Sequence, residues 1–310
     1  MRAVAAQDRH LSVRRRTTPR RPRRPQARKH GNTGKIMTTY ASLLSPMATA
    51  AHAVGALLVT SPQRTTAPPP DTMDELATAY LAIESPAITV MRRHLDALLP
   101  GVPWAEELHG EHSLGSGADA GLPAVGDAWM VDVIDGAVQY MQGLPQFCVS
   151  LALVRDGEPV AAALHAPLLG ETYLAAAGHG ATRNGEPVAP SSRTRLGAAF
   201  VGTGHPPFIA EQPAAAAAAG RSLAAVLPAV SAVRNLGPTS WQIADTAAGR
   251  LDAFWEYGRD DANLLPGALV AREAGAVVTD TEGRPWRAGA TGFLAAPRAL
   301  HGELLQLLKP

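Results

Sequence analysis

The chain has 310 residues, of which 46% are hydrophobic, enough for a substantial core, and this excludes an intrinsically disordered protein. The single cysteine, Cys148, excludes an internal disulfide framework, and no apolar run approaches the roughly 18 residues that a membrane-spanning helix needs. We therefore expect a globular protein of the reducing cytoplasm without a membrane span.

The formal net charge of +1 hides an uneven distribution along the chain. Residues 1–36 hold 12 of the 28 Lys and Arg residues and a single acid, Asp8, so residues 37–310 carry 16 basic and 26 acidic residues, a balance of −10. Residues 1–36 cannot bury enough apolar surface to order themselves, and we expect a disordered basic tail. Three explanations stay open: translation that starts at Met37, a tail without a role, and a tail that binds nucleic acid or a membrane surface. The acidic remainder argues against nucleic acid as a partner.

The part of the chain that follows this tail begins with helical patterns. Residues 40–59 are rich in alanine and compatible with a helix, and a Pro-Pro-Pro linker at 68–70 must break regular structure. Two more helices are expected over 74–83 and 87–99, separated by Pro86.

The middle of the chain reads as antiparallel strands. Residues 147–154 and 159–166 are apolar runs joined by a turn that contains Asp156-Gly157, which is a strong hairpin signal. A strand over 172–176 and a turn at Asn184-Gly185 continue this pattern. The last third predicts an α/β arrangement, with expected elements in this order: helices over 214–226, 242–249 and 264–274, and a strand over 276–279.

The most informative motif is the apolar run from Trp129 to Ala137, which ends in Asp132 and Asp135 with Gly136 directly after them. Two carboxylates held close together repel each other unless a divalent cation lies between them, and ligation by oxygen alone favours Mg²⁺. A metal-dependent phosphate site is the first hypothesis. The alternative is a strand that ends in an ordinary turn with a solvated Asp pair, because D-x-x-D-G also occurs in such turns.

Further motifs extend this pattern in a fixed order, and together they resemble the inositol monophosphatase family, whose hallmark is W-x-x-D-P-[IL]-D-G-T. The resemblance covers roughly residues 105–308, and the motifs that carry it are Trp129–Ala137, Gly178-x-Gly-Ala181, Asn184-Gly-Glu-Pro187, Arg234-Asn-Leu-Gly237, Ala248–Glu256 and Arg272-Glu-Ala-Gly275. The resemblance implies a divergent member of a superfamily of Mg²⁺-dependent phosphomonoesterases. It also implies a layered α-β-α-β-α sandwich of the type shared with fructose-1,6-bisphosphatase, with an α+β part over about 37–195 and an α/β part over about 196–310.

The same resemblance implies site residues one at a time. Mg²⁺ would be held by Glu111, Asp132, Asp135 and the backbone carbonyl of Ile134, and Asn263 would complete a second site. Glu111 and Asp135 would be the catalytic residues. The phosphate would lie at the start of a helix opened by Gly136 and Ala137, where unpaired amides attract anions. Gly204 and Glu256 would border the substrate.

Two departures from the family pattern bear on activity. Asn263 stands where the family has an Asp ligand, and an amide brings no negative charge, so a second metal should bind more weakly. Asp260 and Asp261 are near in sequence, but a shift of two or three residues at a helix start should turn their side chains away. Ala137 replaces a Thr whose hydroxyl helps to orient the attacking water.

Two functions therefore stay open. The first is Mg²⁺-dependent hydrolysis of a small phosphorylated metabolite, such as an inositol, sugar or nucleotide phosphate, by metal-activated water. The second is a repurposed family member that keeps the fold and the anion pocket with impaired phosphatase activity. Because dimers are common in the family, a homodimer is compatible with either function.

Overall fold

The computed structural model describes residues 33–61, 70–105, 122–207 and 209–309. Residues 34–310 form one unit by their contacts. The first 32 residues of the basic tail, most of the Pro-Pro-Pro linker and Glu111 lie outside the described residues.

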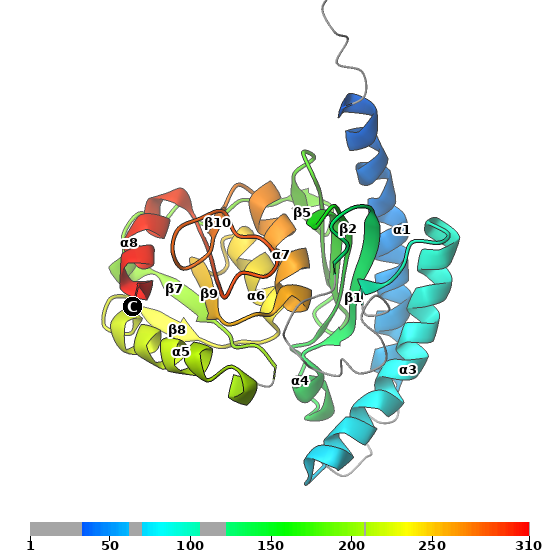
Figure 1. Ribbon diagram of the computed structural model, residues 1–310, viewed down its shortest axis with the longest axis horizontal. Helices are drawn as coiled ribbons and strands as arrows, with labels where there is room; N and C mark the ends of the chain where they lie inside the picture. The colour runs from blue at the N-terminus through cyan, green and yellow to red at the C-terminus, as the bar shows by residue number, and fades with distance from the viewer. Residues whose placement is uncertain (1–32, 62–69, 106–121, 208, 310) are drawn as a thin grey trace, which may run out of the picture. The chain divides into compact units, whose positions relative to one another are not determined.

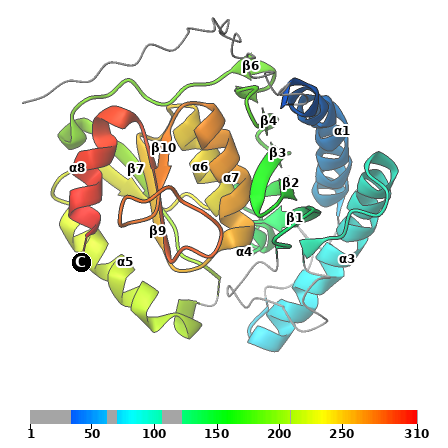
Figure 2. The ribbon, with the colours of Figure 1, turned by 45° about the horizontal axis from the view of Figure 1, so that its top comes forward.

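Helices and sheets alternate in five layers (Figures 1 and 2). The outer layer on one side consists of α1 (Thr33–Thr60) and α3 (Met73–Leu98), which pack on the first sheet. The central helices α6 (Thr239–Ala247) and α7 (Asp261–Glu273) lie between the two sheets. The second sheet is covered on its other face by α5 (Pro213–Val226) and α8 (Arg298–Leu308). This order confirms the predicted α-β-α-β-α sandwich.

The first sheet has six strands, each antiparallel to its neighbours. In spatial order they are β1 (Asp127–Asp135), β2 (Cys148–Arg155), β3 (Glu158–Ala166), β4 (Glu171–Ala176), β5 (Ala181–Arg183) and β6 (Glu186–Pro187). The hairpin predicted at Asp156-Gly157 joins β2 to β3, and both residues have positive φ, 53° and 79°. Such values are those of the tight turns whose twist matches that of the two flanking strands.

The second sheet has five strands and mixed directions. In spatial order they are β10 (Val277–Thr279), β11 (Gly292–Ala296), β9 (Ala253–Tyr257), β7 (Phe200–Thr203) and β8 (Ala232–Arg234). The strands β8, β7 and β9 are parallel, so their carboxyl ends meet at one edge, where ligands bind in open α/β sheets. The remaining elements are the short helix α4 (Ala137–Met141) and two 3-10 turns, Leu196–Ala198 and Ile209–Glu211.

The prediction of a helix break at Pro86 is wrong, because α3 runs through this residue without interruption. A proline inside a helix removes one backbone hydrogen bond and crowds the preceding turn. Here the buried face continues across it, with Ile83 on one side and Ala87 and Met91 on the other packed into the core. Tertiary packing of an apolar face supplies most of a helix's stability in a folded protein, and it outweighs the local loss.

One helix also corrects the expectation about apolar runs. Within α1, the segment Tyr40–Thr60 has 21 residues with a mean hydropathy of 1.5, which is long and apolar enough to cross a membrane by length and composition alone. Its buried side chains, including Met47, Val54 and Leu58, belong to the core formed with the first sheet. Core helices of globular proteins meet the same criterion, so this is weak support for a span.

We predict that Leu95→Ala, which empties a fully buried position of α3, lowers the free energy of unfolding by about 2–5 kcal/mol, because it removes apolar contacts and leaves a cavity. Urea denaturation measures this change. Leu81→Ala is the matched control, since Leu81 lies on the same helix with 40% of its surface exposed and should lose no more than about 1 kcal/mol. Equal losses in the two variants would contradict the packing described for α3.

Candidate functional site

The end of β1 is irregular where its two aspartates lie. Asp132 pairs with Ser150 and Asp135 with Cys148 of β2, so β1 contains one extra residue at this point, a β-bulge. In a regular strand, residues three apart point to opposite faces, and a bulge changes this by re-aiming one of the side chains. The Asp132 carboxylate accepts a hydrogen bond of 2.9 Å from the backbone N–H of Ile134 and thereby closes the local turn.

Gly136 follows β1 directly and occupies a position that only glycine fits. Its φ is 89°, and a Cβ atom there would lie 3.0 Å from the backbone oxygen of Gln146. Gly136 is the N-cap of α4, which begins at Ala137, so both residues stand at a helix start beside Asp135. Their role toward a phosphate group stays a prediction.

Asp135 is buried, and its hydrogen-bond donors come from another part of the chain. The Oδ2 atom of Asp135 accepts from the backbone N–H of Ser240 at 3.3 Å and from the Ser240 hydroxyl. Burial raises the pKa of Asp135 to about 7, and these hydrogen bonds oppose that shift. The Cys148 thiol lies 3.9 Å from the same oxygen, and burial raises its pKa, which keeps it protonated.

The carboxyl end of β9 and the start of α7 add three more polar side chains. Glu256 has 1% of its surface exposed and accepts a hydrogen bond of 3.2 Å from the Thr239 hydroxyl. Asp260 has 3% exposed and accepts one of 2.7 Å from the side-chain amide of Asn263. The remaining side-chain oxygens of Glu256, Asp260 and Asn263 are buried and accept no hydrogen bond from an N–H or hydroxyl group of the described residues. The carboxyl groups of Glu256 and Asp260 hydrogen-bond to each other. Buried polar atoms are almost always paired, so these oxygens require a counterpart.

The charges in this cluster repel one another. Burial is the main cause that raises the pKa of Glu256 to about 7 and that of Asp260 well above its usual value. A side-chain hydrogen bond between Glu256 and Asp260 lowers the pKa of Glu256 and raises that of Asp260. The charges of nearby carboxylates raise the pKa values further: Asp135 acts on Glu256, Glu256 and Asp132 act on Asp260, and Asp260 acts on Asp135. Among the described groups that shift these pKa values there is no cation. A buried, uncompensated negative charge must be relieved by protonation or by a bound cation.

These residues fit a hard divalent cation by the type of their donors, which are carboxylate and amide oxygens. Within the described parts of the chain, no three His, Cys, Asp or Glu side chains lie so that they could hold a metal ion together. The predicted ligand Glu111 lies outside those parts. Glu84, an acid upstream of the motif, accepts a hydrogen bond of 2.7 Å from Tyr80 within α3, in the outer helical layer.

Gly204 lies directly beside Glu256. The role of the two residues at the substrate border stays a prediction. A Cβ atom on Gly204 would come within 2.6 Å of Glu256 Oε2 and 3.1 Å of Thr239 Oγ1, so glycine is needed for the loop to pass this close. A cavity of about 300 Å³ opens next to it. It is lined by Thr203, Gly204, His205, Ala219, Leu223, Leu227, Val233, Arg234 and Asn235.

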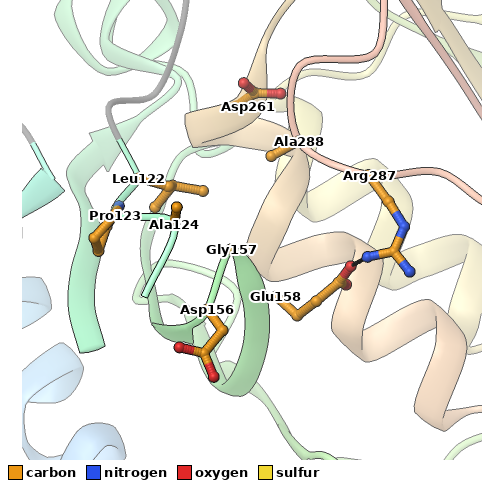
Figure 3. Close-up of a pocket in the computed structure, with 9 residues that line it drawn as sticks. All are labelled: Leu122, Pro123, Ala124, Asp156, Gly157, Glu158, Asp261, Arg287 and Ala288. Atoms are coloured by element: carbon orange, nitrogen blue, oxygen red, sulfur yellow. Dashed lines mark hydrogen bonds and ion pairs between the residues drawn. The ribbon is translucent and has the colours of Figure 1, made fainter. Parts of the chain in front are cut away.

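A second cavity, of about 270 Å³, lies beside Asp261 at the start of α7 (Figure 3). Leu122, Pro123 and Ala124 line it together with the hairpin residues 156–158, and Arg287 forms an ion pair with Glu158 at its rim. Asp261 lines this cavity, whereas Asp132, Asp135, Glu256 and Asp260 do not.

Three residues of the site were missed by reasoning from the sequence. Thr239 and Ser240 are adjacent hydroxyl residues directly after Pro238 at the start of α6, and this pattern was the available signal. The expectation that Asp260 would turn away is wrong, because Asp260 is the N-cap of α7 with φ −152° and ψ 49°. The rotation of a helix does not apply to a residue that precedes it.

Comparisons with known proteins show what the chain is similar to in sequence and in fold. The sequence model of the inositol monophosphatase family matches residues 88–310. The chain is 32% identical over 189 residues to an inositol-1-monophosphatase of Mesorhizobium japonicum, covering 58% of this chain and 67% of that relative. It is 34% identical over 155 residues to a protein of Xylella fastidiosa named Nus factor SuhB, covering 50% of this chain and 55% of that relative. The chain thus spans about half to two thirds of the length of these relatives.

Solved structures share the fold. An inositol monophosphatase from Anabaena superposes with a TM-score of 0.69 at 25% identity, and the match covers 87% of this chain and 96% of that one. The similarity therefore extends over most of both chains.

We predict that Glu256→Gln stabilises the metal-free protein more at high than at low pH. A carboxyl whose pKa rises from 4.5 to about 7 on folding contributes stability that is present at low pH and is lost as the pH rises to about 7. The variant does not lose this stability. In EDTA, its free energy of unfolding by urea should therefore exceed that of the wild type by an amount that grows between about pH 5 and about pH 8. Glu303→Gln, exposed on α8, is the control. An advantage that stays constant with pH would refute the buried-charge account.

Proposed function

Because the chain belongs to the inositol monophosphatase family, we propose that it hydrolyses a small phosphate monoester in the cytoplasm with Mg²⁺ as cofactor. The observation that supports this most is the set of buried side-chain oxygens at the end of β9 and the start of α7, those of Glu256, Asp260 and Asn263, that accept no hydrogen bond from an N–H or hydroxyl group of the described residues. Such a cluster destabilises a fold unless a ligand uses it.

The residues that would hold the metal come from three parts of the chain. In this proposal Asp132, Asp135 and the Ile134 carbonyl are ligands at the end of β1, Asn263 adds an amide oxygen from α7, and Glu111 completes the set. Mg²⁺ bound there would neutralise phosphate oxygens and lower the pKa of a coordinated water. The aspartates and glutamate are hard oxygen ligands of the type that Mg²⁺ requires.

The other residues of the site bind and orient. The Ser240 hydroxyl and backbone amide fix the Asp135 carboxylate in one direction. The amides at Gly136 and Ala137 would face the phosphate. Glu256, held by Thr239, would accept hydrogen bonds from hydroxyl groups of the substrate. The cavity beside Gly204, with an apolar floor from α5 and the polar side chains of Arg234 and Asn235, has room for the alcohol part.

A second function is favoured by specific residues. Ala137 lacks the hydroxyl expected for orienting the water, and Asn263 lacks the charge of an aspartate. The similar protein of Xylella fastidiosa is named a Nus factor, which is not a phosphatase name. The alternative is thus a protein that binds a phosphorylated ligand with little turnover, and either form is compatible with a homodimer.

Under the phosphatase proposal, Asp135→Asn should lower phosphate release at least about a hundredfold, since even changes to residues behind a metal ligand reduce activity about 10–100-fold. The assay is a panel of inositol, sugar and nucleotide monophosphates at several Mg²⁺ concentrations. Asp156→Asn, a remote substitution in the β2–β3 turn, should leave release unchanged. Full activity in Asp135→Asn would contradict the assigned role.

The two functions differ in what a double substitution does. If the protein is a repurposed binder, the wild type should release little phosphate, and Asn263→Asp combined with Ala137→Thr should raise turnover at least about tenfold, because it adds one ligand charge and one hydroxyl. If the phosphatase proposal holds, the wild type is already active on at least one member of the panel. Turnover in the wild type would therefore exclude the alternative.

A further inference from the structure

Asp260 is a buried acid that no structural role explains. An aspartate at an N-cap usually accepts a hydrogen bond from the backbone of the first helical turn, which is the reason for its preference there. Asp260 makes no such bond although it caps α7. One of its oxygens accepts from Asn263, and the other is buried with the carboxyl group of Glu256 as its partner.

The neighbouring aspartate shows what a structural acid looks like at this point. Asp261 is buried to a similar degree, with 4% exposed against 3% for Asp260. Its Oδ1 atom accepts a hydrogen bond of 2.8 Å from the backbone N–H of Gly289. Asp261 thus fastens the loop before β11, and the two adjacent acids face different surroundings.

The surroundings of Asp260 consist of other acids. Its neighbours by electrostatic interaction are Glu256 and Asp132, and Asp260 in turn acts on Asp135. The carboxyl groups of Glu256 and Asp260 hydrogen-bond to each other, and two carboxylates can do so only with a proton between them, whose place a cation could take. The N-cap position is what allows this approach, since the backbone there has not yet entered the helix.

Asn263 and Asp260 complement each other chemically. Asn263 occupies the helical position at which the resemblance to the family implies a charged ligand, and it donates its amide N–H to Asp260. An asparagine can ligate a cation through its oxygen and can also hold a neighbouring carboxylate, whereas an aspartate at 263 would repel Asp260. The charge missing at 263 is present three residues earlier in the chain.

We propose that Asp260 is a ligand of a divalent cation at the start of α7, that it supplies the carboxylate charge missing at Asn263, and that Asn263 positions it. This inference rests on the proposed metal dependence. In this interpretation the negative charge absent from position 263 lies at position 260 instead, and the site keeps its total negative charge.

The test is calorimetric titration of the metal-free full-length protein with Mn²⁺ and, separately, Mg²⁺ as the only added ligand. Asp260→Asn should weaken cation binding at least about tenfold, because it removes one ligand charge from a buried site. Asparagine caps helices as well as aspartate, so the fold should be kept. The matched control Asp261→Asn should bind within about threefold of the wild type.

A variant that exchanges the two side chains shows whether Asp260→Asn weakens cation binding by removing a ligand or by a nonspecific effect on the site. In Asp260→Asn combined with Asn263→Asp, the carboxylate moves to the helical position, and affinity should return to within about threefold of the wild type. Thermal unfolding provides a second readout: in EDTA Asp260→Asn should melt no lower than the wild type, since a repelling charge is gone, while the rise in melting temperature caused by Mg²⁺ should shrink.

Three outcomes would overturn the inference. If the wild type takes up no cation, the proposed metal dependence fails, and the role of Asp260 fails with it. If the wild type binds cations and Asp260→Asn binds them equally well, Glu256 and Asp260 merely share a proton, and only the role of Asp260 fails. If the swap shows no recovery, position 263 cannot replace 260, and the relocation is wrong.

Discussion

The structure depends on one electrostatic constraint: several carboxylates are buried close together. Among the described residues that shift their pKa values there is no cation. Asp135, Glu256 and Asp260 all have raised pKa values because they are buried, and each is near another acid. Folding alone does not favour such an arrangement, since two apolar residues would fill the volume with less penalty. From this arrangement we infer a ligand that carries positive charge.

The layered fold brings these acids together by three separate devices. A bulge between Asp132 and Asp135 changes the direction of the end of β1, which is the corner of the fold where the site lies. Parallel pairing of β7 and β9 brings Gly204 beside Glu256 at their carboxyl ends. The central helices α6 and α7 then start at this corner, so their first residues supply hydroxyl, amide and carboxylate groups.

Much of this architecture could be predicted from local signals in the sequence. The Asp156-Gly157 turn, the strand ending at Asp135 and the glycine after it each have a backbone requirement that few residues meet. What could not be predicted depends on tertiary contacts. The continuity of α3 through Pro86 follows from packing on the first sheet, which outweighs the local preference. The direction of Asp260 follows from its being the residue before α7 begins, and helix boundaries are the least certain part of a sequence prediction.

A crystal structure of the full-length protein grown with Mn²⁺ tests the central claim most directly, through an anomalous difference map recorded at the manganese absorption edge. We predict a peak within coordination distance of the carboxylates of Asp132, Asp135 and Asp260. A map without any peak at this corner, with Glu256 and Asp260 joined by a short hydrogen bond, would show that protons balance the buried charge and would contradict the account.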